Sequence, residues 1–214
     1  MYPPVWGDGT SATPCRADAL RTVVSCEAVL TLLGAGSLIF GDKMAVLRDA
    51  YYPKHELMEQ AEAATVLAWR RFGLRCRDLF TEGEDTSWCE IGDDNGAVAV
   101  ESAGTPVRPE PKGGGAFARV MHAPGRVSVG VLDLTGSRRG RWSEPTAPGR
   151  VTSVTVRILT GLPAQWSAVA AVLGADDDHF VEIAAREVPH RWGRALEVEL
   201  PLVDGWSVLR LSLR

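Results

Sequence analysis

The stretch Val-Thr-Ser-Val-Thr-Val-Arg-Ile-Leu at residues 151–159 decides the fold class, because its side chains alternate in character. In an extended chain, one face carries mainly polar side chains, those of Val151, Ser153, Thr155 and Arg157. The opposite face carries mainly apolar side chains, those of Thr152, Val154, Val156 and Ile158. A period of two residues is typical of a β-strand with one face in a hydrophobic core. Residues 151–159 are therefore predicted to form a strand of a sheet that is buried on one side.

Comparable short segments recur after residue 86, and Pro- and Gly-rich joints separate them. The further predicted strands are 88–91, 97–101, 116–121, 126–134, 166–173, 180–186, 195–200 and 206–211. The first two of these are expected to pair as a hairpin, because Asn95-Gly96 supplies the positive φ values of a tight turn. About nine short strands at this spacing favour an antiparallel β-sandwich over residues 87–214.

Residues 1–86 are predicted to be a helical segment with one buried strand. Apolar side chains recur at helical spacing in residues 17–33 and 54–80, and Trp69 is the best candidate for a core anchor on the longer helix. Pro53 would occupy the first turn of that helix. Gly34 is expected to cap the first helix, and residues 37–40 form an apolar run that suits a buried strand. A helix hairpin followed by a sandwich makes the chain an α+β protein.

Composition excludes several classes of function. The 214 residues hold 23 Lys+Arg and 27 Asp+Glu, a net charge of −4 that gives no support for a nucleic-acid or anionic-membrane partner. No run of about 18 apolar residues is present to span a membrane. The start of the sequence lacks the pattern of a secretory signal, so we expect a cytoplasmic location. No structural metal is predicted, because the four cysteines contain no C-x-x-C pair. No cofactor is predicted either, because Gly34-Ala-Gly36 lacks the third glycine and the preceding strand of a dinucleotide-binding loop.

Local motifs give no catalytic centre. Asp133-Leu-Thr-Gly136 lacks the Asp-Thr/Ser-Gly pattern of an aspartic protease and is interpreted as a turn. The run Asp176–Asp178 could bind calcium, although a solvated turn is the simpler interpretation. The four histidines form no His-x-x-x-His pair, and no Gly-x-Ser-x-Gly elbow is present. No catalytic residue is therefore predicted.

Aromatic residues give a different indication. Seven tryptophans are present, and an indole beside a carboxylate is a usual arrangement for holding a sugar ring. Tyr51 and Tyr52 follow shortly after Asp42, and Trp142 lies in the Gly-rich loop 136–149. These four residues are the predicted substrate-binding residues.

Several segments together resemble glycoside hydrolase family 66, the dextranases and cycloisomaltooligosaccharide glucanotransferases. The likeness rests on Leu-Leu-Gly-Ala-Gly-Ser-Leu-Ile-Phe-Gly-Asp at 32–42, Asp-Ala-Tyr-Tyr-Pro at 49–53 and the helix that ends Arg-Asp-Leu-Phe at 77–80. These match the end of the family's catalytic barrel. Segments 88–92, 95–96, 131–136, 174–177 and 198–206, with Trp142, are similar to the β-sandwich that follows it. The resemblance implies that Asp42, Tyr51 and Tyr52 lie on the face where barrel active sites are built.

The resemblance also implies what is missing. Retaining hydrolysis needs two carboxyl groups about 5–5.5 Å apart, and in the family they come from earlier barrel strands that have no counterpart here. We therefore expect a carbohydrate-associated protein that is non-catalytic alone, a support or glycan-binding module for an α-glucan or oligosaccharide. One alternative is a subunit or fragment of an active glycoside hydrolase, with a protein partner completing the barrel. Another is an interaction protein that binds a second chain through its helix face.

Overall fold

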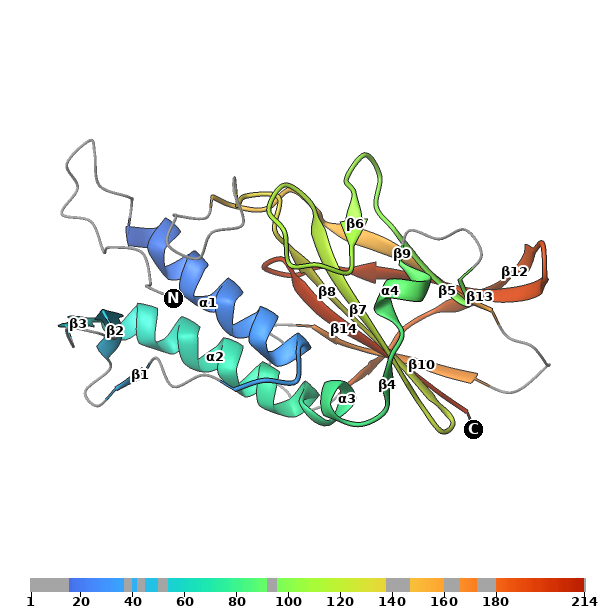
Figure 1. The fold of residues 1–214 in the computed structure, drawn as a ribbon, viewed down its shortest axis with the longest axis horizontal. Coiled ribbons are helices and arrows are strands. Elements are labelled where there is room, and N and C mark those ends of the chain that lie inside the picture. Colours follow the sequence, from blue (N-terminus) through green and yellow to red (C-terminus); the bar gives the residue numbers. More distant parts are fainter. Residues whose placement is uncertain are drawn as a thin grey trace.

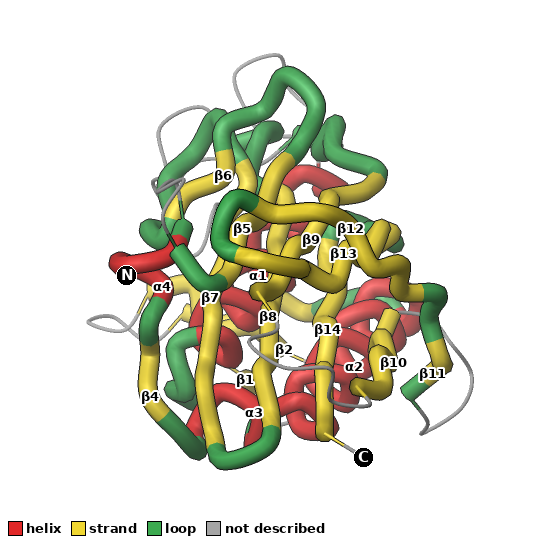
Figure 2. The backbone as a smooth tube through the Cα atoms, turned by 90° about the vertical axis from the view of Figure 1, so that its right-hand side faces the viewer, coloured by secondary structure: helices red, strands yellow, loops and turns green. Residues whose placement is uncertain are grey.

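The computed structural model describes residues 16–36, 40–41, 45–49, 54–91, 96–137, 147–159, 166–172 and 180–213. Helices α1 (Arg16–Leu32) and α2 (Gln60–Cys76) lie on one side of a seven-stranded sheet, and a four-stranded sheet covers its other side (Figure 1). Figure 2 shows the strands of both sheets in front of the helices. The predicted α+β class with an antiparallel sandwich is confirmed.

The seven-stranded sheet has the order β11-β10-β14-β8-β7-β4, and β6 pairs with β7 beside this path. Its strands are β4 (Glu84–Asp85), β6 (Val107–Arg108), β7 (Ala116–Ala123), β8 (Arg126–Asp133), β10 (Trp166–Val172), β11 (Val181–Glu182) and β14 (Trp206–Leu213). All the pairings are antiparallel except that of β6 with β7.

The four-stranded sheet has the order β12-β13-β9-β5, with β5 (Val98–Glu101), β9 (Ser153–Leu159), β12 (Ala185–His190) and β13 (Gly193–Pro201). Alternate residues of β9 are buried, which confirms the alternation read from the sequence. The buried face of β9 and its neighbours meets the seven-stranded sheet in a core made largely of valine and leucine. β-branched side chains suit this pleated, two-sided core.

Residues 88–91 do not form the predicted hairpin with 97–101. Residues Ser87–Glu90 are instead a single helical turn, α4, and β5 pairs with β9. The Asp85 carboxylate explains this turn, because its Oδ1 accepts a hydrogen bond from the Ser87 backbone N–H at 3.1 Å. A side chain that binds the backbone two residues ahead favours a turn over continued strand pairing.

The N-terminal part differs from the prediction in two respects. Residues 40–41 are not a lone strand, because β1 (Phe40–Gly41), β2 (Ala45–Asp49) and β3 (Lys54–Leu57) form an antiparallel sheet. The helix predicted over 54–80 begins at Gln60, since Lys54–Leu57 pair with β2. A capping box fixes that start: the Glu62 carboxylate accepts the Glu59 backbone N–H at 2.8 Å. After Cys76 the chain continues as α3 (Asp78–Thr81).

Helices α1 and α2 run parallel to each other rather than as the predicted hairpin (Figure 1). Arg16 at the start of α1 binds Glu62 at the start of α2, with 2.7 Å between Nη2 and Oε2. Near the other end, Thr31 lies against Gly73. The connection through β1–β3 returns the chain to its starting end, which makes this direction possible. The predicted cap is confirmed: Gly34 has φ +70° and its N–H bonds Thr31 O at 2.9 Å.

One core joins the helices to the sheet. Trp206 of β14 is fully buried, and its ring contacts Trp69 and Phe72 of α2 with centroids 5.4 and 4.5 Å away. Trp69 is therefore the core anchor that the sequence predicts. At β8 the absence of a side chain on Gly130 lets Leu32 and Phe80 approach the backbone. The helical layer thus sits directly on the sandwich.

Cys26, Cys76 and Cys89 lie in the described ranges. Cys26 of α1 and Cys76 of α2 are buried, whereas Cys89 is exposed. Burial raises the pKa of the Cys26 thiol to about 11 and that of Cys76 to about 12. Both therefore behave as small apolar core side chains.

Candidate functional site

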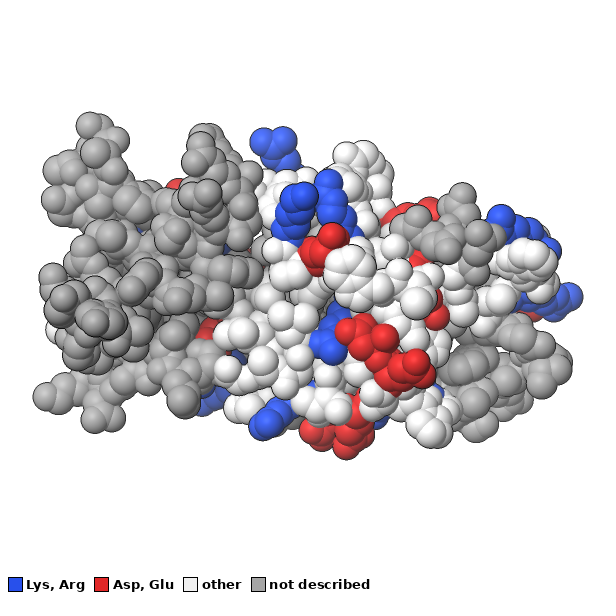
Figure 3. Space-filling view, viewed as in Figure 1, with Lys and Arg blue, Asp and Glu red and all other residues white. Residues whose placement is uncertain are grey.

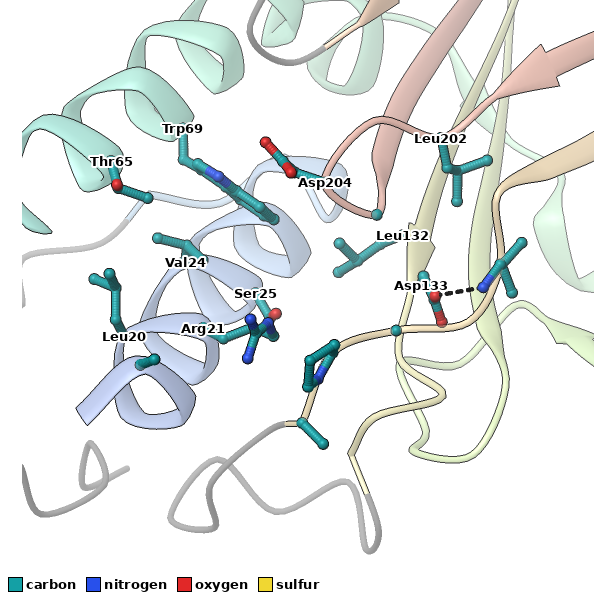
Figure 4. A pocket seen from close by; sticks show the side chains of 16 residues that line it. Leu20, Arg21, Val24, Ser25, Thr65, Trp69, Leu132, Asp133, Leu202 and Asp204 are labelled. Carbon is teal, nitrogen blue, oxygen red and sulfur yellow. Dashed lines mark hydrogen bonds between the residues drawn. The ribbon is translucent and has the colours of Figure 1, made fainter. Parts of the chain in front are cut away.

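A cavity of about 560 Å³ lies where the two helices meet the sandwich (Figure 4). Its walls come from α1, α2, the end of β8, residues 147–151 and the turn at 202–205. The polar side chains in its lining are Arg21, Ser25, Thr65, Asp133 and Asp204. Small-molecule sites usually occupy roughly 300–1,000 Å³, so the cavity has the size of a ligand site.

Asp133 builds the wall of the cavity. Its Oδ1 accepts the Thr135 N–H at 2.8 Å and the Thr135 hydroxyl at 2.7 Å, and Oδ2 accepts the Val151 N–H at 2.8 Å. The bond to Val151 is drawn in Figure 4. Gly149 lies so close that an added Cβ would meet the Asp133 carboxylate at 2.0 Å. The motif 133–136 is therefore the turn that the sequence predicts, and its acid is occupied in holding two loops together.

Asp204 is held at the cavity by a tight turn between β13 and β14. Its φ is +50°, a conformation that Asp and Asn tolerate better than most residues, and Gly205 follows with φ +84°. Asp133 N–H donates to the Gly205 carbonyl at 2.7 Å, which ties the turn to β8. Within the described part of the chain, Asp204 has no hydrogen-bond or ion-pair partner, and it is exposed. Its carboxylate is available to a ligand.

The helices supply the opposite wall. Figure 4 shows Arg21 of α1 and Trp69 of α2 extending toward the sheet and the 202–205 turn. The Arg21 guanidinium lies 3.1 Å from the Asp18 carboxylate, one turn earlier on α1. Trp69 is 6% exposed, so little of its ring is open to the cavity. The cavity lining thus combines carboxylates, a guanidinium, hydroxyls and an indole.

The predicted binding residues Asp42, Tyr51, Tyr52 and Trp142 lie outside the described residues. The same holds for Asp176–Asp178, which is interpreted from the sequence as a solvated turn, with calcium binding as the alternative. The cavity is therefore built from residues that sequence reasoning did not select as ligand contacts. One local signal exists for its turn: Asp204-Gly205 between two predicted strands is typical of a tight connection. No cluster of three metal-ligating side chains occurs in the described ranges.

A second polar cluster lies away from the cavity, where α4 meets β7. His122 Nε2 is 3.2 Å from the Glu90 carboxylate, and this hydrogen bond raises the pKa of His122. The Thr86 hydroxyl donates to the same carboxylate at 3.1 Å. Glu90 is buried, so these partners offset the cost of placing its charge inside the protein.

The surface carries mixed charge. On the described part of the face in Figure 3, basic and acidic side chains lie next to one another. No helix in the described ranges is long and apolar enough to cross a membrane.

Comparison with known proteins shows a likeness in fold to a solved enzyme. No family model and no curated protein sequence matches the chain. A solved cycloisomaltooligosaccharide glucanotransferase of Paenibacillus sp., in complex with cycloisomaltoheptaose, is similar with 14% identity and a TM-score of 0.70. The match covers 89% of this chain and 27% of that enzyme. The chain thus spans about a quarter of the neighbour's length, and at this identity the likeness shows a shared fold.

Proposed function

We propose that the chain is a carbohydrate-associated protein that binds an α-glucan or a related oligosaccharide and is non-catalytic alone. It would serve as a support or glycan-binding module like the C-terminal part of a dextranase-like glycoside hydrolase. The observation that carries this proposal is the cavity of about 560 Å³ with available polar groups, set in a fold shared with a glucanotransferase solved with a cyclic oligosaccharide.

The chemistry of the cavity suits a saccharide. Each sugar hydroxyl both donates and accepts hydrogen bonds, so a site for it needs acceptors and donors together. Asp204 supplies a carboxylate acceptor, and Ser25 and Thr65 supply hydroxyls. Apolar wall residues such as Leu20 and Trp69 can meet the C–H surface of a ring.

The different hydrogen bonding of Asp133 and Asp204 favours binding over hydrolysis as the function of the cavity. Glycoside hydrolysis uses two carboxyl groups that flank the scissile bond, and each needs a free oxygen. Asp133 is 7% exposed and its oxygens are occupied by three protein donors. Among the described lining residues this leaves Asp204 as the available acid, which is sufficient for recognition and insufficient for the reaction.

Asp42, Tyr51, Tyr52 and Trp142 are proposed as further contacts to the saccharide, in line with the resemblance to the barrel end. The division into residues 1–86 and 87–214 is kept as the proposed organisation. A cytoplasmic location is also part of the proposal.

A second candidate function is the binding of another protein chain through α2, including a partner that completes a barrel. Leu67 and Leu74 lie one heptad apart and are 51% and 67% exposed, which is unusual for leucines on a packed helix. Size-exclusion chromatography with light scattering tests this candidate. An assembly that the Leu74→Lys variant dissociates would support it, and a monomer at all concentrations would contradict it.

Affinity electrophoresis of the full chain through gels containing dextran tests the main proposal, with a panel of other α-glucans in parallel gels. The wild-type chain should be retarded by at least one of these glucans. Asp204→Asn should lose most of the retardation, because the amide replaces a charged acceptor while tolerating the same backbone conformation. Asp78→Asn is the matched control, since Asp78 is exposed and lies outside the cavity. Unchanged mobility on every glucan would refute the proposal.

A further inference from the structure

The outer face of the four-stranded sheet carries a row of compensated charges. Glu197 of β13 accepts hydrogen bonds from Arg157 Nε on β9 and from Arg186 Nε on β12, both at 2.7 Å. Arg157 Nη1 also donates to Glu101 of β5 at 2.8 Å. The row thus crosses all four strands. These ion pairs lower the pKa of Glu197 and raise that of Arg157, so both groups stay charged and paired near neutral pH.

Two hollows lie on this face, one on each side of Glu101. The first, of about 120 Å³, has a floor of small residues that includes Ala97, Ala99 and Ala195, and His190 lies at its rim. The second, of about 160 Å³, is lined largely by hydroxyl-bearing and charged side chains, among them Thr155 and Glu199. Glu101 lines both hollows. Each is smaller than the roughly 300 Å³ at which sites for whole small molecules begin, so each has room for one unit of a chain.

The groups around the hollows select against charged ligands. Glu101 and Glu197 are offset by Arg157 and Arg186, so the face presents hydrogen-bonding groups without a net field. Glu199 accepts the Thr155 hydroxyl at 3.0 Å and also the Ser153 hydroxyl, and its charge is partly answered by these donors. A neutral ligand with many hydroxyls can donate hydrogen bonds to the carboxylates and accept them from the guanidinium groups. A charged ligand would lie close to a group of its own sign, because acidic and basic side chains alternate along this face.

An exposed aromatic side chain stands at one end of this face. Trp192 lies in the turn between β12 and β13 and is 64% exposed. Its backbone N–H donates to His190 Nδ1 at 3.2 Å, which couples the turn to the rim of the first hollow. The Arg191 guanidinium lies 5.5 Å from the centroid of its ring. In Figure 1 this hairpin lies at the opposite end of the molecule from α1 and α2, far from the cavity.

We propose that this face binds a neutral oligosaccharide chain, which runs along β9 with one ring in each hollow and can extend to Trp192. The segment Ser153–Leu159 is about 20 Å long at the rise of a β-strand, enough for a short oligosaccharide. The inference rests on the proposed carbohydrate association and adds a second contact surface, separate from the cavity at α1 and α2. A module with two such surfaces would hold a long glucan at two points.

Isothermal titration of the full chain with a linear isomaltooligosaccharide tests the sheet-face site. Ala97→Arg places a long side chain over the first hollow from an exposed position, and we expect at least a fivefold weaker affinity. Ala68→Arg on the exposed side of α2 is the matched control and should bind as the wild type does. Glu101→Gln is a second, gentler variant that removes the carboxylate shared by both hollows, with a similar expected loss. Added salt should leave the affinity unchanged, because the ligand is neutral.

The outcomes separate this inference from the proposed function. Weaker binding in Ala97→Arg and Glu101→Gln, with Ala68→Arg unchanged, supports the sheet-face site. Wild-type affinity in both variants, with loss only in Asp204→Asn, assigns binding to the cavity and overturns the sheet-face site while the proposed function stands. No binding of any α-glucan by the wild-type chain overturns both.

Discussion

Replacing Gly130 by alanine should loosen the helical layer from the sandwich. Gly130 lies in β8, on the face that meets the helices, and an added Cβ would lie 2.2 Å from Leu32 Cδ2 and 2.6 Å from Phe80 Cζ. Leu32 and Phe80 are 0% and 1% exposed, so both side chains would have to shift inside the core. The new methyl group must therefore displace α1 and α3 or distort β8.

The expected cost follows from overpacking. An extra methyl group in a filled core destabilises a protein by about 1–3 kcal/mol, which lowers the urea midpoint by roughly 1 M. Urea unfolding followed by tryptophan fluorescence measures the loss, since Trp69 and Trp206 lie in the same core. Gly36→Ala is the matched control: its Cβ would meet nothing within 4 Å, so its midpoint should stay the same or rise slightly.

A double-mutant cycle makes the test specific. Leu32→Ala alone should cost about 2–5 kcal/mol as a cavity in the core. Combined with Gly130→Ala it should cost less than the sum of the two, because the shortened side chain makes room for the new methyl. Wild-type stability of Gly130→Ala, or simple additivity with Leu32→Ala, would refute the direct seating of the helices on β8.

Three further changes probe other parts of the structure. Asp133→Asn should reduce the free energy of unfolding by about 2 kcal/mol, because an amide cannot accept all three hydrogen bonds. Calorimetry should show this as a lower melting temperature, and an unchanged melting temperature would show that the carboxylate does not hold the loops. The hydrogen bond to Glu90 raises the pKa of His122, so protonated His122 stabilises the folded state. This stabilisation is complete at a pH below the ordinary pKa of 6.5 and is lost as the pH rises through the raised pKa. Urea midpoints against pH should show that decline in the wild type and lack it in His122→Gln, and parallel curves would contradict it. Cys89→Ser should remove one rapidly reacting thiol from titration with an aromatic disulfide, whereas serine at either buried thiol of α1 or α2 should remove none.

The sandwich could be predicted from the sequence because its strands carry their own signal. In β9 the period of two residues places alternate side chains in one core, and no distant information is needed to see it. Residues 54–57 carry no comparable signal: Lys-His-Glu-Leu is compatible with a helix, and its strand conformation depends on pairing with β2. The strand predicted at residues 88–91 is wrong for a different reason. Their composition suits a strand, but the hydrogen bond between the Asp85 carboxylate and the Ser87 N–H favours a helical turn.

The cavity could not be predicted because its walls come from segments far apart in the sequence. Arg21 and Asp204 belong to α1 and to the last turn, and only the packing of the helices on the sheet brings them to one space. Asp133 was recognisable as a turn residue, but its bond to Val151 depends on the approach of a second loop. Sequence periodicity predicts single helices and strands, whereas this cavity depends on how they pack against one another.

Hydrogen exchange of the full chain with and without a linear isomaltooligosaccharide tests the central claim, carbohydrate binding, most directly. Amides that slow in the presence of the sugar mark the surface it covers. We predict slower exchange at residues 202–205 and 147–151 around the cavity, and along β9 and the 190–193 turn on the sheet face. Exchange that is identical with and without the sugar, at concentrations that saturate a weak site, would contradict the account.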